Sequence, residues 1–452
     1  MLGTSLKLNF RHPDRRLQVL WNCALLSLLL FPLWPGGGGV ALILIAIATC
    51  KQQFHIIIRR PLNWGLAFLA GWLVITACIA FRPADAFLGL ANILPYFIVV
   101  AGYSTLIQTP AQLRQMAWML IVGAVPVLIL GFGQLFWGWA GSDLSQAVLG
   151  WAMQPQGNPV GRMASVFMYA NTLAAYLQIV FILGLGLWLE TYQTLRDHSI
   201  YPFPALLGAV ETKSNFVDFS RSRPRRLGFL SVVVMASAIA LILTYSRNAW
   251  AITVLGCLAF ALYQGWRWLV AVVAGVAGSV IGAAFAPQPV QQWLRAIVPA
   301  YFWARLTDQL YANRPPAMLR VTQWQFALSM TQQRPWMGWG LRNFTPLYQE
   351  QMHVWLGHPH NLFLMLTAET GIPATILLCS LVGWVLARGV LLVASTPRHN
   401  DRVIVFSCLV AFGGCILFNT ADVTLFDVRV NGLGWLLLSA ICGVVYYRQE
   451  PM

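Results

Sequence analysis

The stretch GHPHNLFLMLTAETGIP, residues 357–373, places two histidines directly before an apolar run. An imidazole has an ordinary pKa of about 6.5, so His358 or His360 is suited to accept a proton from a hydroxyl near neutral pH. Two arginines, Arg162 and Arg247, adjoin other apolar runs. A guanidinium binds phosphate oxygens through paired hydrogen bonds and needs no metal to do so. Together these side chains suit the transfer of a sugar from a lipid-linked diphosphate to a hydroxyl.

The two arginines also have a structural interpretation as interface anchors. Their aliphatic stems would lie along apolar surface while the charged heads reach water. Arg162 precedes a predicted membrane span, and Arg247 lies in the tight turn TYSRNAW between two others. Both turns fall on the predicted outer side, where short loops are usually poor in lysine and arginine. This placement favours a functional role over anchoring.

The histidines raise the alternative of a metal site. Three of the chain's seven histidines, His353, His358 and His360, lie within eight residues. Their spacing provides no cysteine or carboxylate ligand at a recognised zinc distance. The eight cysteines are scattered without a CxxC pair, which argues against a thiolate site and against disulfides. We therefore expect no metal and no cofactor.

Two further polar residues are candidates because of their positions. Glu369 is the plain exception among predicted spans that are nearly free of charge, and ionisable residues there are costly and often functional. It either binds substrate or hydrogen-bonds the backbone near Gly371 and Pro373. Arg342 follows the turn-rich stretch RPWMGWG that leads toward the histidines. We include Arg342, Glu369 and His358 as substrate-binding candidates.

The elements that must position these side chains are membrane-spanning helices. The chain has 452 residues, of which 58% are hydrophobic and 10% charged, with a mean hydropathy of +0.66. Its apolar runs have the length that a helix needs to cross a hydrocarbon core. The sequence predicts an all-α integral membrane protein with about twelve spans: 17–33, 38–50, 62–81, 86–108, 115–137, 164–190, 228–246, 249–264, 267–286, 361–387, 403–421 and 432–447.

The charge pattern predicts the orientation. The net charge is +15, but the 29 lysines and arginines form short clusters between apolar runs, so they indicate topology and not a nucleic-acid partner. Most of them become cytoplasmic if both termini are cytoplasmic. The candidate residues then lie outside. The cluster RSRPRR, residues 221–226, predicts contact with anionic membrane lipids.

We expect one polytopic membrane domain, 1–452, with three long loops: an outer loop 138–163, a basic cytoplasmic loop 191–227 and a large outer segment 287–360. Apolar residues at helical spacing begin at Val290 and again at Val321, which predicts short helices in the large segment. That segment delivers His358 and His360 to the membrane boundary.

Four stretches resemble the O-antigen ligase and polymerase family of bacterial glycan-assembly enzymes. They are GRMASVFMYANTLAAYL with Arg162 and Asn171, TYSRNAW with Arg247, WQFALSMTQQRPWMGWGLRNF, and HNLFLMLTAETG with His360 and Asn361. They occur in the family's order. Ser165 stands where the family usually has glycine, and Ala374 departs from its Gly, Thr or Tyr.

The resemblance implies a membrane glycosyltransferase with a GT-C-like architecture. It would move a glycan, with inversion and without metal, from undecaprenyl diphosphate to a glycan or lipid-linked acceptor at the periplasmic face of the bacterial inner membrane. His360 would be the base, Arg162 and Arg247 would hold the diphosphate, and Asn361 would orient the histidine. Asn171 is carried over with its motif as a substrate-binding residue.

A different class within the same superfamily is the bicarbonate or small-anion transporter. Transport needs a hydrophilic path across the bilayer. Apart from Glu369, the predicted spans offer mainly isolated Ser, Thr, Asn and Gln residues. The pattern therefore favours glycosyl transfer.

Overall fold

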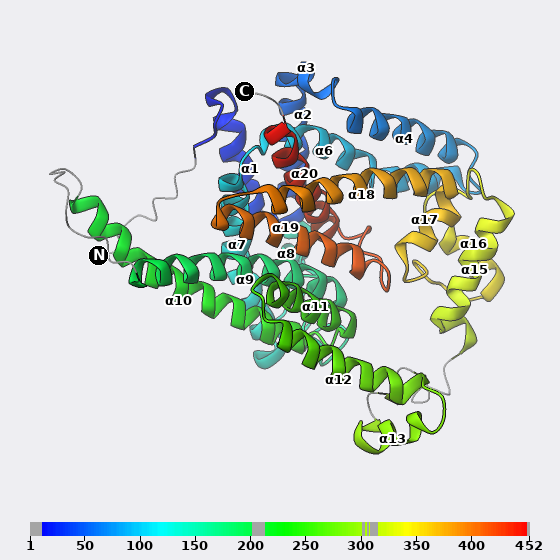
Figure 1. Cartoon of the computed structure of the whole chain (residues 1–452). Coiled ribbons are helices and arrows are strands. Elements are labelled where there is room, and N and C mark those ends of the chain that lie inside the picture. Colours follow the sequence, from blue (N-terminus) through cyan, green and yellow to red (C-terminus); the bar gives the residue numbers. More distant parts are fainter. Residues whose placement is uncertain (1–10, 201–212, 301–302, 305–306, 308–314, 450–452) are drawn as a thin grey trace.

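The structure is a computed structural model that describes residues 11–200, 213–300, 303–304, 307 and 315–449. In this part of the chain every regular element is a helix (Figure 1). Ten of these helices are long and apolar enough to cross a membrane, so the protein is a multi-pass membrane protein. Part of the predicted basic loop 191–227 and part of the segment 287–360 lie outside the described residues.

Most of the described helices of the bundle follow one another with short connections. Those that form the membrane bundle are α1 (Gln18–Leu30), α2 (Pro35–Gln52), α4 (Pro61–Cys78), α5 (Pro83–Leu90), α6 (Leu94–Leu106), α7 (Pro110–Trp137), α9 (Ala170–Ile200), α10 (Lys213–Leu243), α11 (Arg247–Tyr263), α12 (Arg267–Phe285), α18 (Ile372–Ser395), α19 (His399–Phe418) and α20 (Val428–Gln449). The shorter elements are η1 (Arg15–Leu17), α3 (Phe54–Ile57), α8 (Asp143–Leu149), α13 (Val290–Ile297), η3 (Pro316–Met318), α15 (Arg320–Gln333), α16 (Phe344–Met352) and α17 (Leu362–Thr370).

Two predicted spans are shorter than a full crossing. The first, 17–33, is the 13-residue helix α1, and the eighth, 249–264, is the 17-residue helix α11. The fourth, 86–108, consists of α5 and α6, which together form one 24-residue apolar segment. The ten long helices and these two short ones match the twelve predicted runs.

The predicted tenth span, 361–387, is wrong as a single helix. It is divided at Gly371 into α17 and the spanning helix α18. Gly371 has φ 84°, and Pro373 stands in the first turn of α18, where its missing N–H costs nothing. Glu369 is therefore not inside a span but near the end of the short helix that precedes one.

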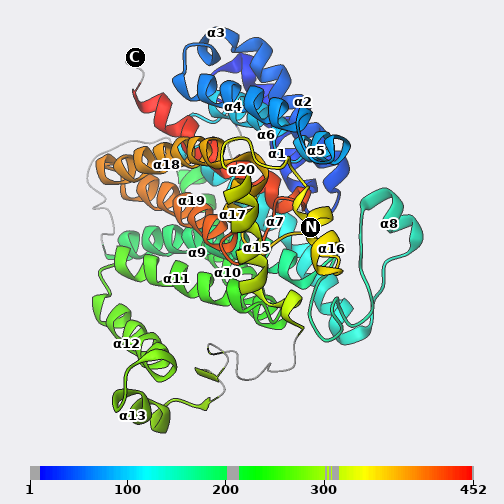
Figure 2. The same cartoon turned by 90° about the vertical axis from the view of Figure 1, so that its right-hand side faces the viewer.

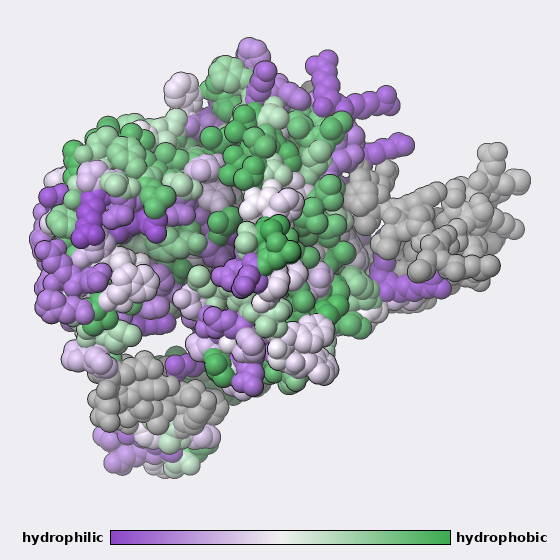
Figure 3. Space-filling model, turned by 180° about the vertical axis from the view of Figure 1, so that it is seen from behind, coloured by the Kyte–Doolittle hydropathy of each residue, from purple (hydrophilic) through white to green (hydrophobic). Residues whose placement is uncertain are grey.

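The bundle has a buried centre and an apolar outer surface. Of the apolar windows, that of α20 is 83% buried and that of α9 is 78% buried, so these two helices are the most enclosed. Peripheral helices α4, α10 and α12 instead expose large apolar side chains such as Phe68, Val232 and Val276. Hydrophobic residues cover the middle of the molecule in Figure 3, between hydrophilic groups at the left and the upper right. This arrangement suits a hydrocarbon surrounding.

The bundle has two distinct ends. We call the end that carries loops 138–169, 244–246, 334–361 and 419–427 the site face, and the end with loops 53–60, 107–109, 264–266 and 396–398 the opposite face. Arg114 of α7 pairs with Glu190 of α9 and Asp401 of α19 at the opposite face. Residues 11 and 449, the first and last described, also lie at this end.

The site face is covered by the short helices of the large outer segment. In Figure 1, α15, α16 and α17 gather at the right-hand end of the bundle, and Figure 2 looks onto them from that side. The apolar stripes starting at Val290 and Val321 become α13 and α15. The expectation of short helices in this segment is thus confirmed for the part that the structure describes.

Candidate functional site

A cavity of about 630 Å³ opens at the site face between α11, α15 and the loop that joins α19 to α20. Three of its lining residues are Arg162, Arg247 and His360, which are far apart in the sequence. Asn171, Arg320 and Asp422 line the same cavity. The structure therefore brings together the two arginines and the histidine that the sequence predicted as the catalytic group.

Arg162 is held in place by its own loop and by the turn before α11. Its Nε donates to the carbonyl oxygen of Thr244 at 2.8 Å, and Nη2 donates to Oδ1 of Asn171 at 2.6 Å. A Cβ at Gly157, where φ is 92°, would lie 1.9 Å from the carbonyl oxygen of Arg162, so this turn requires glycine. Burial, and then the nearby Arg247, lower the pKa of Arg162. An anion between the two arginines would relieve that repulsion.

Asp422 is a site residue that the sequence analysis missed. It lies in the loop 419–427, and its Oδ2 accepts a hydrogen bond from Nδ2 of Asn171 at 2.9 Å. Its Oδ1 lies 3.1 Å from Nδ1 of His360. A continuous chain thus runs from Arg162 through Asn171 and Asp422 to His360. The available signal was an acid in a predicted outer loop of a chain that has only 14 acids.

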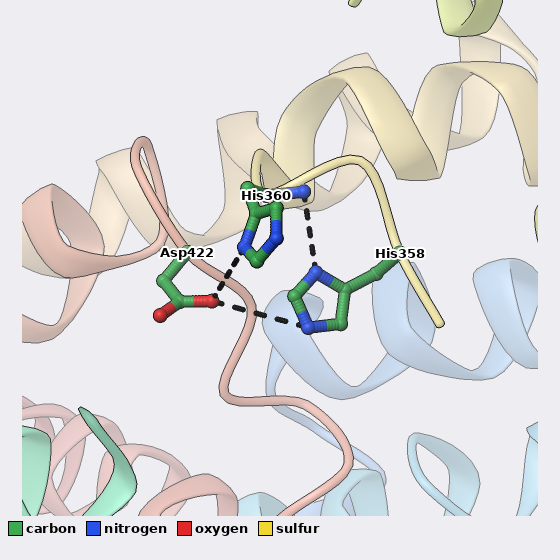
Figure 4. Close-up of side chains that lie close together, drawn as sticks. All are labelled: His358, His360 and Asp422. Carbon is green, nitrogen blue, oxygen red and sulfur yellow. Dashed lines mark hydrogen bonds and ion pairs between the residues drawn. The ribbon is translucent and has the colours of Figure 1, made fainter. Parts of the chain in front are cut away.

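His358, His360 and Asp422 form a triangle (Figure 4). Nδ1 of His358 accepts from the backbone N–H of His360 at 3.2 Å, and Nε2 of His358 lies 3.9 Å from Oδ1 of Asp422. Burial and the neighbouring His360 lower the pKa of His358 to about 4, so His358 is neutral near pH 7. Burial raises the pKa of Asp422, but the hydrogen bond with His360, the charges of His360 and His358 and the N–H of Val423 together outweigh burial and leave the pKa below its ordinary value.

The same triangle is a possible set of metal ligands. One ligand atom from each residue lies within 4.8 Å of the others, and Asp422 supplies the carboxylate that the histidine spacing lacked. Hydrogen bonds also account for the arrangement, because Nδ1 of both histidines already has a partner.

Backbone conformation and local hydrogen bonds fix the position of the histidine segment, residues 357–361. His360 has φ 52°, in the left-handed region that is uncommon for a residue with a side chain. Directly after it, Asn361 caps α17 by accepting from Leu364 N–H at 3.0 Å, and its Nδ2 donates to the carbonyl oxygen of Thr420 at 3.1 Å. Trp324 of α15 donates to the carbonyl oxygen of Pro359 at 3.0 Å. These bonds join the histidine segment to α15 and to the Asp422 loop.

Besides Asn361, three predicted substrate-binding residues lie outside the cavity lining. His358 stacks on Phe426, with ring centroids 6.1 Å apart. The guanidinium of Arg342 lies 6.0 Å from the centre of that same Phe426 ring. Glu369 is buried, and its Oε1 accepts from the backbone N–H of Phe344, the first residue of α16, at 3.1 Å. These contacts favour supporting roles for all three.

Arg247 and Arg320 face the cavity from different elements. Arg247 begins α11, and Arg320 begins α15 in the outer segment. Both side chains are exposed. Within the described residues, neither guanidinium has a hydrogen-bond or ion-pair partner in the chain. Each therefore has its donor atoms available for a ligand.

A second cavity lies beyond the Asp422 loop, between α17, α18, α19 and α20. Its volume is about 280 Å³, and its lining is mainly apolar, with Asn419, Thr424 and Asn431 at the site-face end. Leu362, two residues after His360, contributes to its wall. A charged cavity and an apolar one thus adjoin the same short segment.

Comparison with known proteins agrees with the motifs. Residues 230–379 match the family model described as O-antigen ligase. The chain carries an O-antigen ligase domain. The matched segment of this domain contains Arg247 and His360, whereas Arg162 precedes it. The predicted resemblance to the O-antigen ligase family is confirmed.

Other comparisons add less. No curated protein matches the chain. Among solved structures, a chain from the work described as "Structural coordination of polymerization and crosslinking by a peptidoglycan synthase complex" is similar to this one. The identity is 16%, the likeness covers 86% of this chain and 98% of that chain, and the TM-score is 0.40.

Proposed function

We propose that this protein is a glycosyltransferase that moves a glycan from a lipid-linked diphosphate to a hydroxyl acceptor, without a metal. The observation that carries the proposal is that Arg162, Arg247 and His360 line one cavity at one end of a membrane bundle. The O-antigen ligase domain supports a glycan-transferring enzyme that uses lipid-linked glycans. The donor we propose is undecaprenyl-diphosphate glycan, used at the periplasmic face of the bacterial inner membrane.

The hydrogen bonds of His360 suggest how the acceptor is activated. A carboxylate on Asp422 that accepts from Nδ1–H leaves Nε2 of His360 with its lone pair. Nε2 takes the proton as the acceptor oxygen attacks the anomeric carbon. The bond from that carbon to the diphosphate oxygen breaks, and its electron pair stays on the diphosphate. Attack opposite the leaving group inverts the anomeric centre.

The arginines stabilise the charge that appears on the leaving diphosphate. Among the residues that the structure describes, the guanidinium of Arg247 has no partner, and Arg162 retains Nη1 after its bonds to Thr244 and Asn171. Preorganised donors at a developing negative charge are often the largest single contribution to catalysis. The adjoining apolar cavity suits a substrate that combines hydrocarbon with charge.

The direct test supplies purified protein with a lipid-linked oligosaccharide and an acceptor and measures release of undecaprenyl diphosphate. We expect release by the wild type and a loss of at least about a hundredfold in His360→Ala, since general base catalysis contributes on that order. The thermal unfolding midpoint checks that the variant is folded. Full turnover by folded His360→Ala would remove the proposed base.

Two arms of the same assay test the rest of the mechanism. Arg162→Lys and Arg247→Lys keep the charge but lose the planar fork, so we expect turnover to fall by about tenfold or more. Equal turnover by the lysine variants would reduce these arginines to anchors. Chelator should leave turnover unchanged. Loss with chelator and recovery with Zn²⁺ would instead assign His358, His360 and Asp422 to a metal.

A further inference from the structure

A further cavity lies at the opposite face of the bundle, between the ends of α18 and α20. Its volume is about 590 Å³. The cavity lining consists of Arg388, Leu391, Leu392, Ala394, Ser395, Val445 and Arg448. None of these described lining residues is acidic, so the cavity carries two positive charges that its own lining does not balance. The proposed glycan transfer uses neither arginine.

Arg388 is unusual because it stands inside an apolar spanning helix. It precedes Ser395, the last residue of α18, by about 10 Å along the helix axis. The side chain is half-buried, and its Nε is buried without a hydrogen-bond partner among the described residues. A charged N–H that is removed from water and lacks an acceptor is unfavourable. An anion in the cavity would supply the counter-charge that the described part of the chain does not provide.

Arg448 reaches the same cavity from α20 and is oriented by the end of α18. Its Nη1 donates to Oγ1 of Thr396 at 2.6 Å, and its Nη2 donates to the carbonyl oxygen of Ser395 at 2.9 Å. Both acceptors are neutral, so these bonds hold the guanidinium in place and leave its charge unbalanced. They use two of the five N–H groups of the guanidinium, and the others remain for a ligand.

The surroundings of the cavity favour a lipid over a soluble anion. The apolar window of α18 is only 17% buried, and Val390 and Leu391, which follow Arg388, are both 59% exposed. Leu391 also lines the cavity, together with Leu392 and Val445. Acyl chains that lie along this flank of α18 would bring a phosphate to the two arginines. Basic pockets between spanning helices are suited to the head groups of anionic lipids.

We propose that this cavity binds the phosphate of an anionic phospholipid between Arg388 and Arg448, with the acyl chains against Leu391 and the exposed flank of α18. The bound lipid joins α18 to α20 at the opposite face. This site is separate from the cavity at the site face and does not depend on the proposed function. It also differs from the basic cluster 221–226, because it places a phosphate in a cavity between two spanning helices.

The test titrates phosphatidylglycerol into the purified full chain in detergent and measures bound lipid by native mass spectrometry. Arg388→Met replaces the guanidinium with an apolar side chain that suits a spanning helix. It should bind phosphatidylglycerol roughly ten- to a hundredfold more weakly, because one charge-assisted hydrogen-bonding group is lost. Arg448→Ala should also weaken binding. Arg267→Ala removes an exposed arginine at the opposite face that does not line the cavity, and it should bind as the wild type does.

Two further probes identify the ligand. Phosphatidylcholine has the phosphate and the acyl chains but no net charge, so it should bind more weakly than phosphatidylglycerol. Glycerol 3-phosphate has the phosphate without acyl chains, so it should not compete with the lipid. Phosphatidylglycerol should also raise the thermal unfolding midpoint of the wild type more than that of Arg388→Met, because a ligand that binds only the folded state stabilises it.

Three results would overturn the proposal. The first is wild-type affinity for phosphatidylglycerol in folded Arg388→Met and Arg448→Ala. The second is equal affinity of the wild type for phosphatidylcholine, because the arginines would then not select an anionic lipid. The third is displacement of the lipid by glycerol 3-phosphate at similar concentration, which would make this a site for a soluble anion.

Discussion

At the scale of single residues, the contacts of Glu369 explain this buried acid by a structural role. It is 1% exposed, and its carboxylate accepts from the first N–H of α16. A carboxylate at this position satisfies a helix N–H that has no partner within the helix. Burial raises the pKa of Glu369 to about 7, although the hydrogen bonds to the carboxylate oppose the shift. The residue joins α17 to α16 and stands apart from the arginine cavity.

We expect Glu369→Gln to retain glycan transfer, because the amide oxygen can still accept from Phe344 N–H. Glu369→Ala should lower the free energy of unfolding by about 2 kcal/mol, since it leaves that N–H buried and opens a cavity. The carboxyl pKa is about 7 when folded and about 4.5 when unfolded. The folded state therefore holds more protons between these values, and stability falls as pH rises through that window.

Thermal unfolding of the wild type and of Glu369→Gln from pH 4 to 8 measures this contribution, which is the difference in stability between the two proteins at each pH. The difference matters because His358 has the opposite effect: its folded pKa of about 4 makes stability fall as pH decreases below 6.5. The glutamine variant should lack the component of stability that is lost toward neutral pH. Loss of glycan transfer with unchanged stability would return Glu369 to the list of substrate ligands.

Sequence alone could predict those site residues whose chemistry is distinctive where they stand. Arginines in short outer loops and histidines at a membrane boundary are unusual, so Arg162, Arg247 and the histidine pair were identifiable. The family resemblance then selected His360 over His358. Asp422 and Arg320 are not unusual in outer loops, and only the fold shows that they face the cavity. Ser165, where the family usually has glycine, has φ 53°, so the departure occurs where glycine would fit without strain.

At the scale of elements, the spacing of apolar residues was sufficient to predict the amphipathic helices of the outer segment. The stripes in α13 and α15 follow from side chains recurring every three to four residues. The break between α17 and α18 could not be predicted from hydropathy, because both helices are apolar and Gly371 alone permits the turn. Two backbone hydrogen bonds join this break to the stretch 335–340. The N–H of Gly340 donates to the carbonyl oxygen of Glu369 at 2.8 Å, and the N–H of Ile372 donates to the carbonyl oxygen of Pro335 at 2.8 Å.

The start of α17 offers a test of how an element positions the base. Asn361→Ala removes the N-cap and should cost about 1 kcal/mol of stability. It also removes the bond to Thr420 that joins the histidine segment to the Asp422 loop. We expect kcat to fall with little change in donor KM, because the base is misaligned while the arginines are untouched.

Asn361→Ser is the matched control for this change. A serine hydroxyl restores the cap but is too short to reach Thr420, so stability should recover while kcat stays low. Thermal unfolding and steady-state turnover measure the two quantities. Wild-type kcat in both variants would mean that the bond to Thr420 does not orient His360.

At the scale of the whole molecule, the two ends of the bundle differ in a way that determines where the reaction occurs. The cavity is at the site face, and the basic segments that the sequence assigned to the cytoplasm, including Arg59, Arg267 and Arg398, lie at the opposite face. Positive residues in short loops are retained on the cytoplasmic side during insertion. The fold places the cavity at the end of the bundle away from these basic segments, which supports the proposed periplasmic position of the cavity.

Labelling of single cysteines tests this orientation. Val160 is 75% exposed in the loop beside Arg162, and Gln52 is exposed at the end of α2 on the opposite face. In a parent whose exposed native cysteines are replaced by alanine, the Val160→Cys variant should react with a membrane-impermeant maleimide added to intact spheroplasts. The Gln52→Cys variant should react only after permeabilisation, because its thiol faces the cytoplasm. The reverse pattern would place the cavity inside the cell, where a donor presented at the periplasmic face could not reach Arg162, Arg247 and His360.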